Sequence, residues 1–312
     1  MTATVEQRVD PREVPRGLVG AGIAVTAWST GTILAKYLDM DALAIGAYRF
    51  GTFFILLVIW MRARGVRLDL GIIRKSMWGG LALGADIVLF FSAVKETSVV
   101  NATIIGSLQP IVVGVIAARF FGEKIRVNDA IWSIVALAGA FVVVTSAAND
   151  DIRSLRGDLL AAGAMFSWSA YFIASKQSRG RMSSTEFTAG TSIWTAAICI
   201  AIGLPIGQDL SFPNASNWGW LVVMIIGSGI VGHSLMNWSL QRIPLWVGST
   251  FTLFIPVAST ALAWLALGET ITWLQALAMA AVIAALAMIV IGQTKSVPAT
   301  VAEPAPVEPA SG

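Results

Sequence analysis

The sequence predicts an all-α polytopic membrane protein with ten transmembrane helices, built as two inverted five-helix repeats. The first observation behind this prediction is composition. Of the 312 residues, 56% are hydrophobic and only 12% are charged, whereas a soluble domain has about 25% charged residues. The second observation is length, because a membrane-spanning helix needs ~20 apolar residues. Ten such runs follow one another, at about residues 17–36, 42–61, 76–94, 100–119, 128–147, 157–176, 187–206, 217–238, 247–267 and 272–292.

The third observation is an internal repeat. The fourth and ninth runs align at a shift of 146 residues, which places Pro110 on Pro256 and Glu123 on Glu269. Over residues 16–36 a shift of 140 gives 8 identical residues among 21. These identities are Arg16/Arg156, Gly17/Gly157, Ala21/Ala161, Ala24/Ala164, Trp28/Trp168, Ser29/Ser169, Ile33/Ile173 and Lys36/Lys176. Each unit therefore contains five helices.

Five is an odd number, so the second unit enters the membrane from the side opposite to the first. Inverted repeats of this kind support alternating access in secondary transporters, around a site near the middle of the bilayer. The expected units are residues 17–148 and 157–292. Short tails, 1–16 and 293–312, flank them, and the second is rich in Pro, Ala and Val, which is typical of a disordered segment.

The basic residues predict the orientation. With the N-terminus in the cytoplasm, 16 Lys and Arg residues fall in cytoplasmic segments and 4 in external ones, out of 21 in the chain. Cytoplasmic loops carry the excess of Lys and Arg. We therefore expect both termini in the cytoplasm.

Three ionisable residues lie deep in apolar runs: Arg49, Asp86 and His233. Charged groups are costly there and commonly mark substrate pathways. We expect Asp86 to attract a substrate ammonium group, and His233 to offer a hydrogen bond or a titratable proton. The alternative is one buried polar group per repeat, satisfied by its neighbours. Arg49 could reach the membrane interface, brace helix packing or contact the substrate.

The eighth run carries small and polar residues at four-residue intervals, which places them on one helix face. They are Gly229, His233, Asn237 and Gln241. We expect His233 and Asn237 to line a cavity. Tight helix packing is the alternative, because Ser228 and Gly232 form a small-xxx-small pattern.

Matched tryptophans, Trp28 and Trp168, lie near the middle of the first and sixth runs. They could stack on a substrate side chain, or fill the core or face lipid. The fourth run carries Asn101 and Gln109, which we also count as candidate substrate-binding residues.

Proline and glutamate mark the fourth helix of each unit. Pro110 and Pro256 each remove a backbone donor, which predicts a kink that acts as a hinge or is a braced bend. Glu123 and Glu269 follow a glycine at the helix end. They could carry protons, but this position favours capping the free N–H groups of the next helix.

These features resemble the EamA branch of the drug/metabolite transporter superfamily. The resemblance rests on the two five-helix halves, the Gly-Glu after each fourth helix, and the Arg49-Phe50 pair, and it covers about residues 17–292. Within the branch the chain is similar to the YddG-type exporters of aromatic amino acids. The resemblance implies a substrate cavity between helices 1, 3, 4, 6, 8 and 9. Arg49 has no counterpart in the second half, where Ala189 aligns with it.

The expected function is export of amino acids across the cell inner membrane. An exporter of drugs or other metabolites, proton-coupled or not, is the alternative, and the short loops leave little room for a membrane scaffold or receptor. The chain has one histidine, a lone cysteine, Cys199, and no nucleotide-binding or hydrolase motif. We therefore expect no enzyme activity, cofactor, metal, nucleic acid or obligatory protein partner, and a substrate and the lipid bilayer as the only partners.

Overall fold

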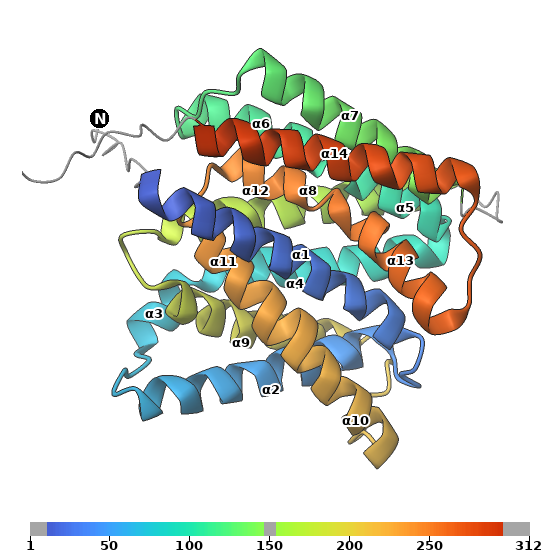
Figure 1. Ribbon diagram of the computed structural model, residues 1–312. Helices are drawn as coiled ribbons and strands as arrows, with labels where there is room; N and C mark the ends of the chain where they lie inside the picture. Colours follow the sequence, from blue (N-terminus) through green and yellow to red (C-terminus); the bar gives the residue numbers. More distant parts are fainter. Residues whose placement is uncertain (1–10, 147–153, 296–312) are drawn as a thin grey trace, which may run out of the picture.

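The computed structural model describes residues 11–146 and 154–295, which fold into a bundle of long helices (Figure 1). Most of both predicted tails lies outside these residues. The first half contains η1 (Pro11–Glu13), α1 (Val14–Ala35), α2 (Ala42–Ala63), α3 (Leu70–Lys75), α4 (Met77–Glu96), α5 (Val99–Gly106), α6 (Gln109–Phe120) and α7 (Val127–Thr145). The second contains α8 (Leu155–Ser178), α9 (Ser184–Gly203), α10 (Ala215–Met224), η2 (Ile225–Ser234), α11 (Leu235–Leu240), α12 (Leu245–Phe251), α13 (Phe254–Leu267) and α14 (Trp273–Lys295).

Ten helical passes make up the described bundle, as the apolar runs predict. Nine of them are long and apolar enough to span a membrane. The remaining pass, α8, has 24 residues, which at 1.5 Å per residue is long enough to cross a bilayer, but it is more polar than the others. The first turn of α1 and the last turn of α14 lie at the same end of the bundle (Figure 1), as an even number of passes requires.

The helices differ from the predicted ones at both ends of the bundle sequence and at one additional short helix. The first helix begins at Val14 and the last continues to Lys295, so parts of both predicted tails are helical. The short helix α3 was not predicted, and Asp69 starts it by accepting a hydrogen bond from the amide of Ile72 at 2.7 Å.

Three passes are not continuous α-helices. The fourth pass is interrupted between α5 and α6, and the ninth between α12 and α13. In the eighth pass, a π-helical stretch, η2, joins α10 to α11. Wide π turns are rare and frequently occur at functional sites.

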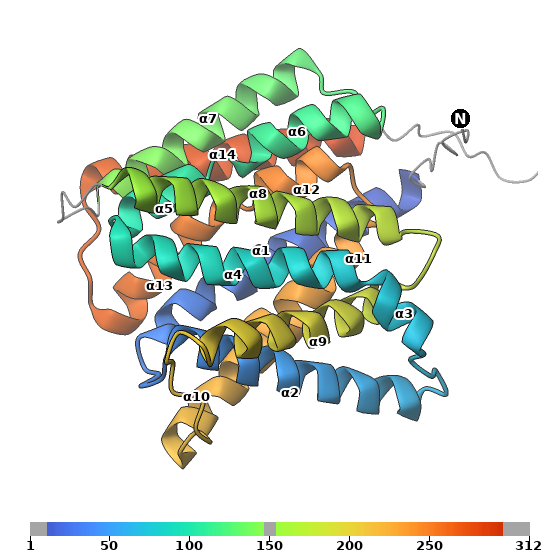
Figure 2. The same cartoon turned by 180° about the vertical axis from the view of Figure 1, so that it is seen from behind.

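The packing follows the repeat. Helix α4 packs along α8, as Figure 2 shows, and their repeat partners, the eighth and first passes, pack along each other. Helices α2 and α9 are repeat partners and pack directly together, as do α7 and α14. The two halves are thus related by an approximate two-fold axis, and residues that meet their own repeat partner lie beside that axis.

Candidate functional site

The two matched tryptophans meet at the centre of the bundle. The ring centroids of Trp28 in α1 and Trp168 in α8 lie 5.1 Å apart, with an interplanar angle of 65°. Edge-to-face contacts of this kind are a favourable arrangement for aromatic rings. Because the two residues are repeat partners, the approximate two-fold axis passes between them. The structure therefore places this pair at the interface of the two halves.

The imidazole of His233 lies against this pair. Its centroid is 5.2 Å from that of Trp28 and 5.3 Å from that of Phe50 in α2. On α8, Tyr171 and Trp168 also contact the imidazole, at centroid distances of 5.9 Å and 6.3 Å. We call Trp28, Phe50, Trp168, Tyr171, Phe172 and His233 the aromatic cluster. All of these side chains are buried except Trp168, which is partly buried.

A directed chain of hydrogen bonds runs from His233 to α9. The hydroxyl of Tyr171 donates to Oδ1 of Asn237 at 3.0 Å, and Nδ2 of Asn237 donates to Oγ1 of Thr188 at 2.9 Å. The Thr188 hydroxyl in turn donates to the carbonyl of Ser184 at 2.7 Å. A hydroxyl carries one proton, so Tyr171 can only accept from Nδ1 of His233, 3.3 Å away. The network therefore assigns the proton to Nδ1.

The remaining nitrogen of His233 faces Arg49. With its proton on Nδ1, the imidazole offers a lone pair at Nε2, which lies 3.4 Å from Nη2 of Arg49. The guanidinium carbon also lies 4.9 Å from the centroid of the Phe50 ring. Arg49 thus turns into the bundle. Its side chain contacts His233 and Phe50 inside the bundle and does not extend to the membrane interface.

The local structure of the eighth pass allows these contacts. Gly232 lies in η2, and a Cβ atom there would come within 2.5 Å of the Trp28 indole, a distance that only glycine permits. The polar stripe faces α8, because Tyr171 contacts both His233 and Asn237, and Gln241 donates to Ser178 at 3.3 Å. The close approach at Gly232 shows that small-residue packing and the polar stripe occupy the same helix.

Three predicted site residues lie apart from the aromatic cluster. Asp86 is near the middle of α4, partly buried, and forms no hydrogen bond or ion pair with any residue that the structure describes. The side chain of Asn101 donates to Thr97 at 3.3 Å near the start of α5. Gln109 is buried at the start of α6 and accepts a hydrogen bond from Thr252 at 3.2 Å.

The last contact joins the two helix interruptions. Gln109 and Pro110 are the first residues of α6, where a proline is well accommodated. Thr252 lies between α12 and α13, and Pro256 is the third residue of α13. Both passes thus break just before their proline, and the two breaks face each other across the repeat interface.

The Gly-Glu sequences end both broken passes in the same way. Gly122 and Gly268 have φ values of 64° and 69°, a left-handed conformation that glycine adopts without strain. The amide of Glu123 donates to the carbonyl of Ala117, and that of Glu269 to the carbonyl of Ala263. These are repeat-partner bonds.

The carboxylates do not cap the following helix, and that prediction was wrong. Glu123 accepts hydrogen bonds from the amides of Leu245 and Trp246, at 2.7 Å and 3.2 Å, and so caps α12 in the other half. It also pairs with Nζ of Lys176 at 3.6 Å. Glu269 pairs with Nζ of Lys36 at 2.9 Å and accepts no backbone amide among the described residues. In both cases the carboxylate pairs with a lysine of the opposite half.

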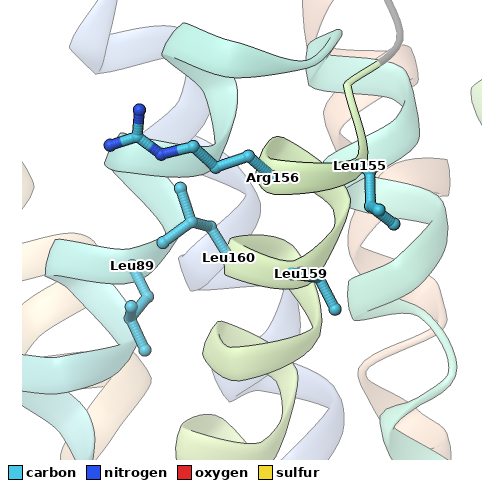
Figure 3. A pocket seen from close by; sticks show the side chains of 5 residues that line it. All are labelled: Leu89, Leu155, Arg156, Leu159 and Leu160. Atoms are coloured by element: carbon cyan, nitrogen blue, oxygen red, sulfur yellow. The ribbon is translucent and has the colours of Figure 1, made fainter.

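Two surface grooves lie away from the aromatic cluster. One, of about 520 Å³, is lined by Leu89 of α4 and by Leu155, Arg156, Leu159 and Leu160 of α8 (Figure 3). Arg156 extends across it and pairs with Glu96 at 3.3 Å. A second groove lies between α4 and α8 on the outer surface. The side chains of the aromatic cluster are instead enclosed between the two halves, where all but Trp168 are buried.

The family follows from comparison with known proteins. The model of the EamA-like transporter family matches residues 15–145 and again residues 155–291. The chain belongs to the EamA-like transporter family. Its two matched segments are the two five-helix halves, so each half is one EamA unit, and the chain is a multi-pass membrane transporter and not an enzyme.

Several EamA relatives have described activities. The threonine/homoserine exporter RhtA of Salmonella typhimurium is 25% identical over 268 residues, covering 84% of this chain and 87% of RhtA. The aromatic amino acid exporter YddG of Ancylobacter novellus is 28% identical over 154 residues, covering 48% of this chain and 52% of YddG. A crystal structure of a protein 22% identical to this chain matches with a TM-score of 0.78, covering 89% of this chain and 98% of that protein. This last match shows a shared fold.

Two members of the hydrogen-bond network around His233 were missed by reasoning from the sequence. Thr188 is the last side chain of the hydrogen-bond chain, yet it lies in a run of small polar residues without any spacing that marks it. Tyr171 joins His233 to Asn237. Its signal was available, because it lies three residues after Trp168 and therefore on the same face of α8.

Proposed function

We propose that this EamA-family protein exports amino acids, aromatic and other neutral ones, across the cell inner membrane. The observation that carries the proposal is the aromatic cluster at the interface of the halves, with its line of polar groups. The described activities of RhtA and YddG support the substrate class. Both termini would lie in the cytoplasm, as the Lys and Arg distribution favours.

Each part of the site would meet a different part of the substrate. Trp28 and Trp168 would pack against the side chain, since aromatic rings combine large apolar area with an N–H donor. His233 and Asn237 would give up hydrogen bonds to Tyr171 and Thr188 and form hydrogen bonds to the substrate instead. Asp86 is the carboxylate at the middle of a spanning helix, and it would attract the ammonium group. Asn101 and Gln109 would line the path along the fourth pass.

Access would alternate by rocking of the halves about the repeat interface. The breaks before Pro110 and Pro256 would absorb the change in backbone angles. The pair formed by Lys176 and Glu123 is buried, with side-chain exposures of 8% and 13%, so it would have to separate before the cluster opens at that end. The Lys36 and Glu269 pair, at 56% and 53% exposure, would be the corresponding contact at the other end.

The network at His233 bears on coupling. A second proton would place an N–H at Nε2 directly against Arg49, only 3.4 Å away. Two donors and two positive charges would then face each other, which is unfavourable. This supports a facilitator or exchanger over a carrier that loads its proton on His233. Among the described residues, the imidazole faces the charged guanidinium of Arg49 and the neutral hydroxyl of Tyr171.

The test is transport by purified protein in liposomes. We expect uptake of labelled aromatic or neutral amino acids, strongly reduced in Asp86→Asn and Asn237→Ala, and retained in Asn214→Ala, whose side chain caps α10 away from the cluster. Transport of drugs or other metabolites without any amino acid would favour the alternative substrate class. An imposed pH gradient should leave the initial rate nearly unchanged, and a strong dependence on it would establish proton coupling.

A further inference from the structure

We propose that Arg49 anchors the carboxylate of the substrate, with the indole N–H of Trp28 as a second donor. This inference rests on the proposed function and deepens it, because it names the group that every amino acid substrate would present at α2. Its basis is an unbalanced set of donors around His233.

The guanidinium of Arg49 lacks a counter-charge. No carboxylate pairs with it among the residues that the structure describes, and its Nε–H is buried without an acceptor. Its hydrogen bond is the long contact to His233 at 3.4 Å. A guanidinium has five N–H donors, and a buried charge without a partner is costly. Most of its hydrogen-bonding capacity is therefore unused.

The surrounding network cannot use that capacity. Every acceptor in the hydrogen-bond chain is already occupied. Nε2 of His233 accepts from Arg49, the Tyr171 hydroxyl accepts from His233, and Oδ1 of Asn237 accepts from Tyr171. The chain is thus directed away from Arg49 and ends on a backbone carbonyl of α9. What the site lacks is an acceptor.

A second donor in the cluster is also unsatisfied. The Nε1–H of Trp28 is buried and has no hydrogen-bond partner. Trp28 and Phe50, the residue next to Arg49, both contact the imidazole of His233, at centroid distances of 5.2 Å and 5.3 Å. Arg49 and Trp28, which carry the two unsatisfied donors, therefore both lie against the imidazole of His233. A ligand that meets both must carry negative charge and at least two acceptor atoms.

A carboxylate has this chemistry. Its two oxygens accept parallel hydrogen bonds from the fork of an arginine, a charge-assisted contact stronger than bonds between neutral groups. The aromatic walls next to the fork would then receive the apolar part of the same molecule. The site exists once per chain, because the repeat partner of Arg49 is Ala189, which is fully buried.

The variants Arg49→Gln and Arg49→Lys test the inference, with Arg64→Gln as matched control. Arg64 directly follows α2 as its C-cap residue and also lies over an aromatic ring, that of Trp60 at 5.1 Å, but it is exposed. Counterflow of a labelled amino acid in liposomes would be challenged with the unlabelled amino acid and with its amide, in which the carboxylate is neutral. Thermal unfolding in detergent with the same two compounds, and with a simple aromatic carboxylate, provides a readout independent of transport.

We expect the amino acid to compete in the wild type and the amide to compete roughly 10- to 100-fold more weakly, as loss of a charge-assisted bond predicts. Arg49→Gln should lose this preference and most counterflow while unfolding at the same temperature or higher. Arg49→Lys should keep part of the preference, and Arg64→Gln all of it. Normal counterflow with an intact preference in Arg49→Gln would overturn the inference.

Failure of the proposed function has a different signature. If the wild type moves no amino acid, that proposal fails, and the thermal measurement decides the inference separately. Stabilisation of the wild type but not of Arg49→Gln by the aromatic carboxylate would then support a carboxylate site. Equal behaviour of the two proteins toward carboxylate and amide would overturn it.

Discussion

Two ion pairs at opposite ends of the bundle are built from the same two repeat positions, yet their environments differ. Lys176 aligns with Lys36, and Glu123 with Glu269. The Lys176–Glu123 pair has side-chain exposures of 8% and 13%, while the Lys36–Glu269 pair has exposures of 56% and 53%. The lysine–glutamate pair is therefore buried at one end of the bundle, and the equivalent pair at the other end is exposed to the surface.

The difference in burial arises at the N-cap residue of α5 in one half and of α12 in the other. Helix α5 follows Ser98, whose hydroxyl accepts a hydrogen bond from the amide of Asn101 at 3.0 Å, so it is capped locally. The repeat partner of Ser98 is Pro244, which precedes α12 and has no side-chain acceptor. The carboxylate of Glu123 supplies the missing cap. The difference between Ser98 and Pro244 thus accounts for the buried position of Glu123, and Lys176 is buried with it as its ion-pair partner.

The comparison shows that two ion pairs at equivalent repeat positions need not hold the two ends of the bundle together equally strongly. A symmetric pair of contacts would favour neither access state. Here the buried pair, its two amide bonds and the bond from Lys176 to the carbonyl of Ile243 all hold one end together. The predictions below either equalise the two ends or separate the contributions to the stronger one.

The largest effect is expected from neutralising the buried carboxylate. Glu123→Gln leaves the ammonium of Lys176 buried without a counter-charge, which costs about 3–5 kcal/mol. Its matched control, Glu269→Gln, breaks an exposed pair and should cost at most about 0.5 kcal/mol. Unfolding of both variants in the same mixed micelles measures the difference. Equal losses of stability would mean that burial does not distinguish the two ends.

Removing the lysine should have a smaller effect. In Lys176→Met the carboxylate of Glu123 keeps its hydrogen bonds from Leu245 and Trp246, so we expect a loss of about 1–3 kcal/mol. A larger loss of stability in Glu123→Gln than in Lys176→Met, measured in the same unfolding assay, would show that the carboxylate binds both the helix amides and the lysine. A larger loss for the lysine variant would contradict the capping role.

A local cap should partly replace the distant one. Pro244→Ser gives α12 the residue that starts α5, at a backbone conformation of φ −55° and ψ 143° that a serine cap adopts readily. In the Glu123→Gln background it should recover about 1 kcal/mol. Ser98→Ala is the reciprocal variant and should lose a similar amount from α5. No recovery by Pro244→Ser would show that the cap contributes little and the charge nearly everything.

The smallest effect is expected at the exposed pair. Lys36→Met should change stability by about 0.5 kcal/mol or less, and raising the salt concentration should reproduce most of that change in the wild type. Salt should leave the buried pair nearly unaffected. Thermal unfolding across a salt series would show this, and a strong salt response that disappears in Lys176→Met would reverse the assignment.

Much of this architecture could be predicted from the sequence, because it depends on local properties. Apolar length located all ten passes, including α8, although α8 is more polar than the others. The two prolines indicated where the fourth and ninth passes break. The repeat matched Trp28 with Trp168 near the middle of two passes, and the structure shows that the two rings are in contact.

The remaining features depend on contacts between distant segments. The partner of Glu123 lies 122 residues away, and the sequence near Glu123 contains no sign of it. The inward direction of Arg49 follows from the position of His233, 184 residues later. Helix α7 begins after Arg126, which provides no side-chain cap, so an expectation based on the nearest helix end was reasonable but wrong.

The central claim is that substrate binds at the aromatic cluster between the halves. Counterflow of a labelled amino acid in liposomes tests it most directly with Trp168→Ala and Trp264→Ala, because Trp168 lies in the cluster while Trp264 of α13 is 53% exposed. Trp168→Ala should reduce counterflow by roughly tenfold or more, consistent with loss of an aromatic contact of about 1.5 kcal/mol or more, and Trp264→Ala should resemble the wild type. Equal counterflow by the two variants would contradict the claim.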